Sequence, residues 1–149
     1  MPANTSPIFT ITPEISWPSI NPIGTASTMV TSTVSNNYDG TTSALLLFSA
    51  GPNGSFIQKV ILEAAGTNTS QAVIRLFINN GNTNTVASNN SLIGQYTLAA
   101  TTASNSISTA HVEIPLMMQI PSPYRIYILI SSSAANTGGW YATAIGGDY

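Results

Sequence analysis

The chain has 149 residues, of which 43% are hydrophobic and only 5% charged, and its formal net charge at pH 7 is −2. Three cations cannot neutralise several phosphates or form a polybasic patch, so the composition argues against nucleic acid and against anionic membrane surfaces as partners. The 19 serines, 19 threonines and 14 asparagines predict a surface of neutral polar groups, which cost less to bury than charges do.

The chain contains no cysteine, which excludes disulfides and zinc–thiolate sites. No apolar run reaches the 18 residues typical of a membrane helix. The first residues lack the basic start and apolar stretch of a secretory signal. We therefore expect a soluble chain that is made in the cytoplasm.

Residues 1–27 predict an extended, proline-rich arm. Five of the nine prolines lie within the first 22 residues, and proline favours extended backbone for itself and its predecessor. Large apolar side chains punctuate this arm and need a surface to cover them. The arm either wraps its own domain or reaches onto a neighbouring subunit. The residues expected to bind a partner are Ile8, Phe9, Ile11, Ile15, Trp17 and Ile20.

Residues 28–149 predict one all-β domain. Stretches rich in Val, Ile, Thr, Phe and Tyr alternate with clusters of Gly, Asn, Ser and Pro, and no segment has a sustained helical period. Asn53-Gly54 and Asn80-Gly81 are typical of tight turns. About eight short strands favour an antiparallel β-sandwich or jelly roll. The expected strands are 28–34, 43–49, 55–64, 72–79, 91–99, 109–114, 124–131 and 139–145.

Several expected strands are apolar on both faces. In 72–79, Ile74, Leu76 and Ile78 share one face, and Val73 and Phe77 flank a charged residue on the other. A sandwich strand with one face in water should be polar at every second position. Either such strands are central in a closed fold or their outer face meets another protein. The low charge favours a chain that functions within an assembly.

His111 is the one histidine, and it shares a strand face with Glu113. Such a pair could supply two metal ligands, but the sequence favours an exposed or hydrogen-bonded strand histidine. A serine nucleophile would need His111 as its base, and no Gly-x-Ser-x-Gly sequence surrounds any serine. We expect no catalytic, cofactor-binding or metal-binding residues, and no enzyme activity.

Lys59, Glu63 and Arg75 predict cross-strand ion pairs. If 55–64 and 72–79 are neighbouring strands, Lys59 and Glu63 share a face and Arg75 could pair with Glu63. The C-terminal Gly146-Gly147-Asp148-Tyr149 indicates a flexible acidic end that could help bind calcium, although its spacing matches no known calcium-binding loop.

Three aromatic residues could form a sugar-binding platform: Trp17, Trp140 and Tyr141. Aromatic faces stack on sugar rings, and this would suit an adhesion module. One of Trp140 and Tyr141 points inward on any half-buried strand, so core packing is the favoured explanation for this dipeptide.

Four stretches of strand and turn residues lie in residues 43–82 and at the C-terminus: Ser49-Ala50-Gly51-Pro52-Asn53-Gly54-Ser55, Gly66-Thr67-Asn68-Thr69, Val73-Ile74-Arg75-Leu76-Phe77-Ile78-Asn79-Asn80-Gly81 and Ala144-Ile145-Gly146-Gly147-Asp148-Tyr149. In these stretches the chain resembles small virion proteins of tailed bacteriophages, of the capsid decoration type. The resemblance covers about half the chain.

This resemblance implies a structural virion protein, most simply a decoration (cement) protein on the capsid exterior. Such a protein binds the major capsid protein and clamps adjoining capsomers, often as a homotrimer, and an extended arm suits that task. The alternative is a tail or fibre component that acts as a carbohydrate-binding adhesion module through exposed aromatic residues.

Overall fold

The computed structural model describes residues 12–16, 38–41, 44–132 and 139–149. Within these ranges the chain forms eight strands and one short 3₁₀ helix, η1 (Ala87–Asn89), which confirms the all-β prediction. The strands are β1 (Thr12–Ser16), β2 (Leu45–Ser49), β3 (Ser55–Ala64), β4 (Ala72–Asn79), β5 (Asn90–Leu98), β6 (His111–Ile120), β7 (Arg125–Ser132) and β8 (Trp140–Asp148).

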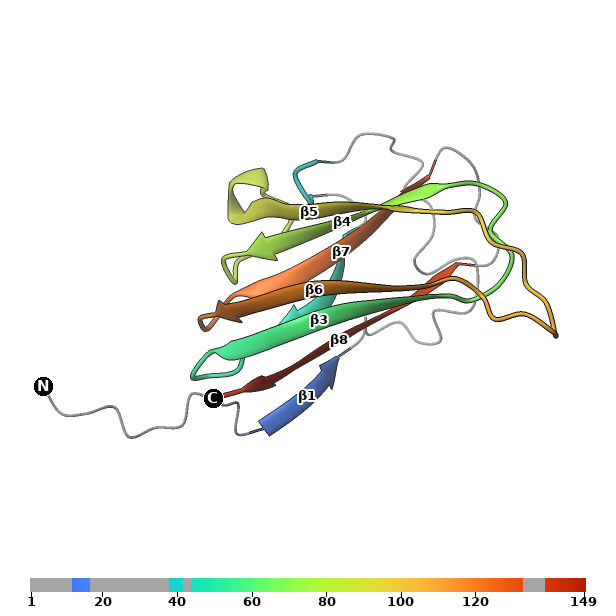
Figure 1. Cartoon of the computed structure of the whole chain (residues 1–149). Helices are drawn as coiled ribbons and strands as arrows, with labels where there is room; N and C mark the ends of the chain where they lie inside the picture. Colours follow the sequence, from blue (N-terminus) through green and yellow to red (C-terminus); the bar gives the residue numbers. More distant parts are fainter. Residues whose placement is uncertain (1–11, 17–37, 42–43, 133–138) are drawn as a thin grey trace, which may run out of the picture.

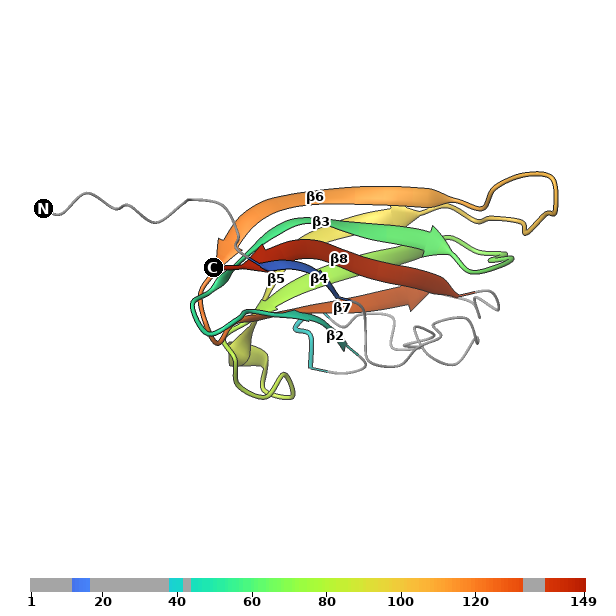
Figure 2. The same ribbon diagram turned by 90° about the horizontal axis from the view of Figure 1, so that it is seen from below.

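The strands form two antiparallel sheets of four strands each (Figures 1 and 2). One sheet has the order β1-β8-β3-β6, and the other has the order β2-β7-β4-β5. The pairing is nested, because the first strand pairs with the last, the second with the seventh, the third with the sixth and the fourth with the fifth. Further β3–β8 and β4–β7 pairings complete the sheets.

A single apolar core lies between the two sheets, as in a β-sandwich. Alternate residues of each strand point into it, as Ala72, Ile74 and Leu76 of β4 do. Its largest buried side chains come from both sheets: Leu47, Phe48, Ile57, Leu62, Ile74, Leu76, Leu98, Ile114, Ile120, Ile126 and Trp140.

The expected strands 55–64 and 72–79 agree with the observed ends of β3 and β4. The expected strand 109–114 ends too early, since β6 continues through Pro115 to Ile120. Pro115 is tolerated because β6 lies at the edge of its sheet and bulges there, with Met117 at a φ of 48°. The expected strand 28–34 lies outside the described residues.

The apolar outer face of the second sheet is now explained in part. β4 and β7 are the central strands of this sheet, and on its outer face Phe77, Tyr127 and Leu129 form a second buried cluster. Gly40 of the same chain lies against Phe77, and a Cβ on Gly40 would come within 3.1 Å of that ring. The chain thus covers part of this face itself.

Candidate functional site

The partner-binding residues expected in the arm lie almost entirely outside the described part of the chain: Ile8, Phe9, Ile11, Trp17 and Ile20. Ile15 belongs to β1, and its backbone is in register with Ile145 of β8. Five residues of the arm therefore add an edge strand to their own domain. The contacts made by the six side chains stay predictions.

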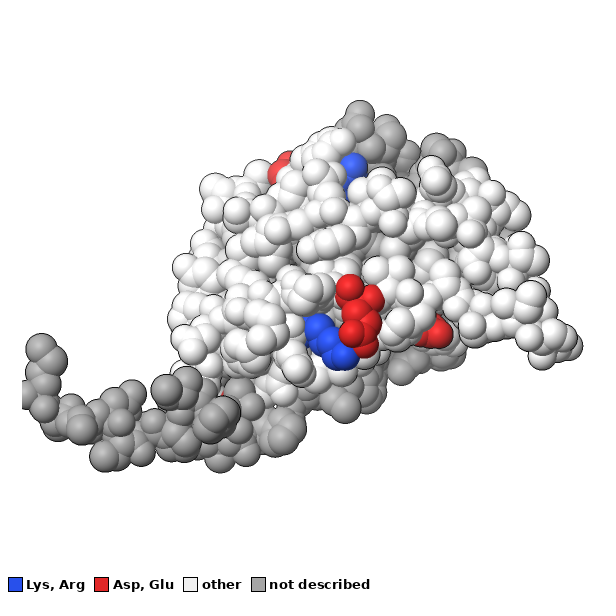
Figure 3. Space-filling model, in the orientation of Figure 1, with Lys and Arg blue, Asp and Glu red and all other residues white. Residues whose placement is uncertain are grey.

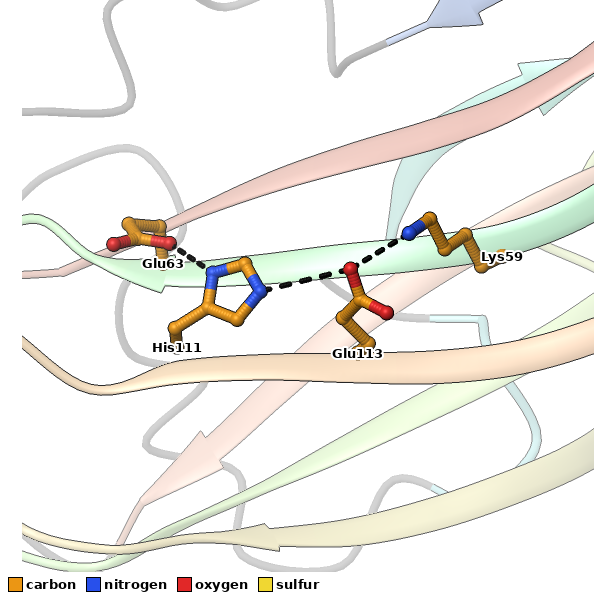
Figure 4. A network of polar contacts seen from close by, with 4 residues as sticks. All are labelled: Lys59, Glu63, His111 and Glu113. Carbon is orange, nitrogen blue, oxygen red and sulfur yellow. Dashed lines mark hydrogen bonds and ion pairs between the residues drawn. The ribbon is translucent and has the colours of Figure 1, made fainter.

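Four ionisable side chains on the outer face of the first sheet lie in one polar network, which comprises Lys59, Glu63, His111 and Glu113 (Figure 4). Glu63 of β3 is in register with His111 of β6, and Nδ1 of His111 lies 2.5 Å from Oε2 of Glu63. Lys59 reaches Glu113 diagonally, with 2.6 Å between Nζ and Oε1. The second ring nitrogen of His111 lies 3.8 Å from Oε1 of Glu113. Figure 3 shows these charges gathered over β3 and β6.

The network favours the protonated form of His111. Its hydrogen bond with Glu63 raises the pKa of His111 above the usual 6.5, and the charges of Glu63 and Glu113 act in the same direction. The hydrogen bond from Lys59 lowers the pKa of Glu113. Because a carboxylate faces each ring nitrogen, the surroundings of His111 favour the protonated imidazole over the neutral one.

Two sequence predictions about these residues are confirmed and one is wrong. Lys59 and Glu63 share a strand face, and His111 is an exposed strand histidine with a hydrogen-bond partner. The expected pair between Arg75 and Glu63 does not form, because β3 and β4 belong to different sheets. Glu63 pairs with His111 instead.

Arg75 lies on the outer face of β4, in register with Leu129 of β7 and Gln95 of β5, and its side chain is buried. Its Nε–H donates to Oε1 of Gln95 at 3.1 Å, and Tyr38 covers the guanidinium with its ring centroid 4.2 Å from Cζ. Nη1 is buried without a hydrogen-bond partner. The sequence did not reveal the roles of Gln95 and Tyr38, because only the strand order and register bring them to Arg75.

The prediction of a flexible acidic C-terminus is wrong. β8 runs to Asp148, whose Oδ1 accepts hydrogen bonds from Ser55 Oγ at 2.5 Å and from the backbone N–H of Gly51 at 3.3 Å. The Tyr149 N–H donates to the Gly54 carbonyl. Asp148 therefore closes the β2–β3 turn onto β8. Among the described residues, no group of three or more His, Cys, Asp or Glu side chains could hold a metal ion.

One of the three aromatic residues expected to form a sugar-binding platform is buried in the core. Trp140 is 1% exposed and packs in the core between the sheets, so neither face of its indole is open to a sugar ring. Tyr141 points outward and is exposed. Core packing is thus confirmed for Trp140, while Trp17 lies outside the described ranges.

No protein-family model, curated protein or solved structure matches this chain. Across the described ranges, no helix has the length and apolar character needed to cross a membrane.

Proposed function

We propose that the chain is a structural virion protein of a tailed phage, and specifically a capsid decoration (cement) protein. In this proposal it binds the major capsid protein on the capsid exterior, as a homotrimer, and stabilises contacts between capsomers. Its body is a jelly roll with an extended proline-rich arm. The phage assignment rests on the resemblance of residues 43–82 and of the C-terminal residues.

The observation that carries the proposal is the low charge of the described surface. Lys59, Glu113 and Glu63 lie in one network with His111, and Arg75 is buried. Among the atoms that Figure 3 does not draw in grey, the rest of this face is uncharged apart from a few atoms at its upper margin. Neutral polar and apolar groups lose little hydration energy on burial, so such a surface suits permanent contact with other subunits.

The nested strand pairing supports the jelly-roll part of the proposal. A chain folded back at the β4–β5 connection forms four antiparallel pairs, and rolling this ribbon yields the sheet orders β1-β8-β3-β6 and β2-β7-β4-β5. Jelly rolls occur in viral capsid and lectin domains. This architecture is compatible with several functions, so the location of the chain must be measured.

The test is the copy number and position of the chain in purified particles, measured by quantitative mass spectrometry and image reconstruction. We expect numbers comparable to those of the major shell subunit and density on the capsid exterior. A few copies at the tail would favour the adhesion module, and absence from particles would contradict both.

The neutral surface predicts a second property that the same particles can test. Contacts between neutral groups are not screened by salt, whereas charge-driven docking weakens steeply as ionic strength rises. The chain should therefore stay bound when particles are washed at about 1 M salt, where the Debye length falls to ~3 Å. Release by salt alone would contradict docking through neutral surfaces.

A further inference from the structure

Arg75 is an unusual residue for its position. Its side chain is 4% exposed on a central strand, between Leu129 and Gln95 of the neighbouring strands. Its hydrogen bond to Gln95 satisfies Nε–H and leaves buried Nη1 without a partner. No salt bridge joins Arg75 to a carboxylate within the described ranges, whereas Lys59 is paired with Glu113.

A buried guanidinium without an anionic partner is costly. Arginine cannot escape this cost by losing its proton, because its delocalised guanidinium stays charged in proteins. Other buried charges in proteins are paired and hydrogen-bonded. The group that best matches a guanidinium fork is a carboxylate, which accepts two parallel N–H bonds. Arg75 thus presents a donor whose natural complement comes from outside the described residues.

Tyr38 provides a route to this donor. Its ring lies over the guanidinium of Arg75, yet the residue is 52% exposed. An exposed tyrosine can change rotamer rapidly and at little cost, so the ring can move aside while the strands stay fixed. Because Gln95 occupies Nε–H, an incoming carboxylate would reach the end of the fork, at Nη1.

We propose that Arg75 is the receiving group of a carboxylate-binding site, with Gln95 positioning the guanidinium and Tyr38 acting as a displaceable cover. The carboxylate is that of a small organic acid or of an aspartate or glutamate on a docking protein. This proposal does not depend on a role in virions, because its test uses the purified chain alone.

The test is NMR of the arginine side chains, of which the chain has two, Arg75 and Arg125. Sodium acetate is added against sodium chloride of equal ionic strength. We expect a saturable shift of the Arg75 Nε–Hε signal, while Arg125 serves as the internal control and shifts only with ionic strength. Arg75→Lys, checked for folding by circular dichroism, assigns the signal.

Tyr38→Ala gives an independent measurement, since a carboxylate that must displace the ring should bind more tightly without it. The expected gain is about two- to fivefold in Kd, which corresponds to the ~0.5–1 kcal/mol of an exposed cation–π contact. If the Arg75 signal follows the Arg125 signal in both the wild type and Tyr38→Ala, the site does not exist.

A second titration distinguishes the two sources of the carboxylate. The probe is an acetylated and amidated Gly-Asp-Gly peptide, with the matching Gly-Asn-Gly peptide as its neutral control. Tighter binding of the aspartyl peptide than of acetate assigns the site to a protein side chain, and tighter binding of acetate assigns it to a small acid. Saturation by neither probe, or equal shifts with the asparaginyl peptide, overturns the proposal.

Discussion

Replacement of Asn68 by alanine should destabilise the fold far more than its position in a connecting segment suggests. Asn68 is fully buried, and its side chain makes a two-way bridge to the residue before β8. Oδ1 accepts from the N–H of Gly139 at 3.0 Å, and Nδ2 donates to the carbonyl of Gly139 at 3.0 Å. The Asn68 backbone also pairs with Thr101 in both directions. The segment between β3 and β4 is thereby tied to the start of β8.

The magnitude follows from the groups that Asn68→Ala leaves behind. Each lost hydrogen bond is worth ~0.5–1.5 kcal/mol, and a buried donor without an acceptor costs ~1–3 kcal/mol. The N–H of Gly139 loses its side-chain acceptor, whereas the carbonyl of Gly139 keeps the N–H of Ala65 at 3.1 Å. We expect a loss of about 3 kcal/mol in the free energy of unfolding, and a fall in Tm of roughly 6–12 °C for a chain of this size.

Urea denaturation measures this loss as a lower midpoint at an unchanged m value. Asn53→Ala is the matched control, because Asn53 is exposed and donates a single hydrogen bond to the carbonyl of Tyr149. Surface substitutions of this kind change stability by about 0.5 kcal/mol or less. Equal midpoints for Asn68→Ala and Asn53→Ala would refute the argument that the bridge to Gly139 holds β8 in place.

Three further outcomes are expected. The pKa of His111 is raised in the folded state, so its contact with Glu63 stabilises the fold fully at a pH below the unfolded-state pKa of His111. This contribution disappears as the pH rises through the folded-state pKa. Urea midpoints measured between about pH 5 and pH 9 should show this loss in the wild type and not in His111→Ala. Met117→Gly should stabilise by up to about 1 kcal/mol, since glycine relieves a φ of 48° at the cost of a more flexible unfolded chain; a lower Tm would contradict this. Deletion of residues 2–11 spares Thr12–Ser16 and should leave the Tm unchanged while particle binding falls; unchanged binding would exclude a docking role for that segment.

The strands that could be predicted from the sequence are apolar, β-branched runs that lie between turn signals. β3 and β4 begin and end where expected, and each is bounded by glycine or asparagine. The expected strands 109–114 and 139–145 end before β6 and β8 do, and the reason is the same for both. Pro115 and Gly146-Gly147 disfavour strands in general, yet an edge bulge accommodates the proline, and pairing of β8 with both β1 and β3 holds the glycines.

The polar contacts show where reasoning from sequence stops. Residues two or four apart on one strand share a face, which placed Lys59 with Glu63 and His111 with Glu113. Which strands become neighbours is decided by the nested topology, with partners that lie 48 residues apart for Glu63 and His111. The burial of Arg75 could not be predicted from the sequence either, because it depends on the contact with Tyr38 and on the central position of β4 in its sheet.

The charged residues of this chain differ in how well they could select a binding partner. Lys59 and Glu113 neutralise each other, and Asp148 is held by hydrogen bonds at the β2–β3 turn, so none of the three is well suited to select a partner. In the proposed assembly, affinity comes from neutral area, which discriminates poorly between surfaces. A desolvated charge discriminates strongly, because a partner that lacks its complement leaves it unpaired. Arg75 would then supply specificity to a surface that otherwise has little.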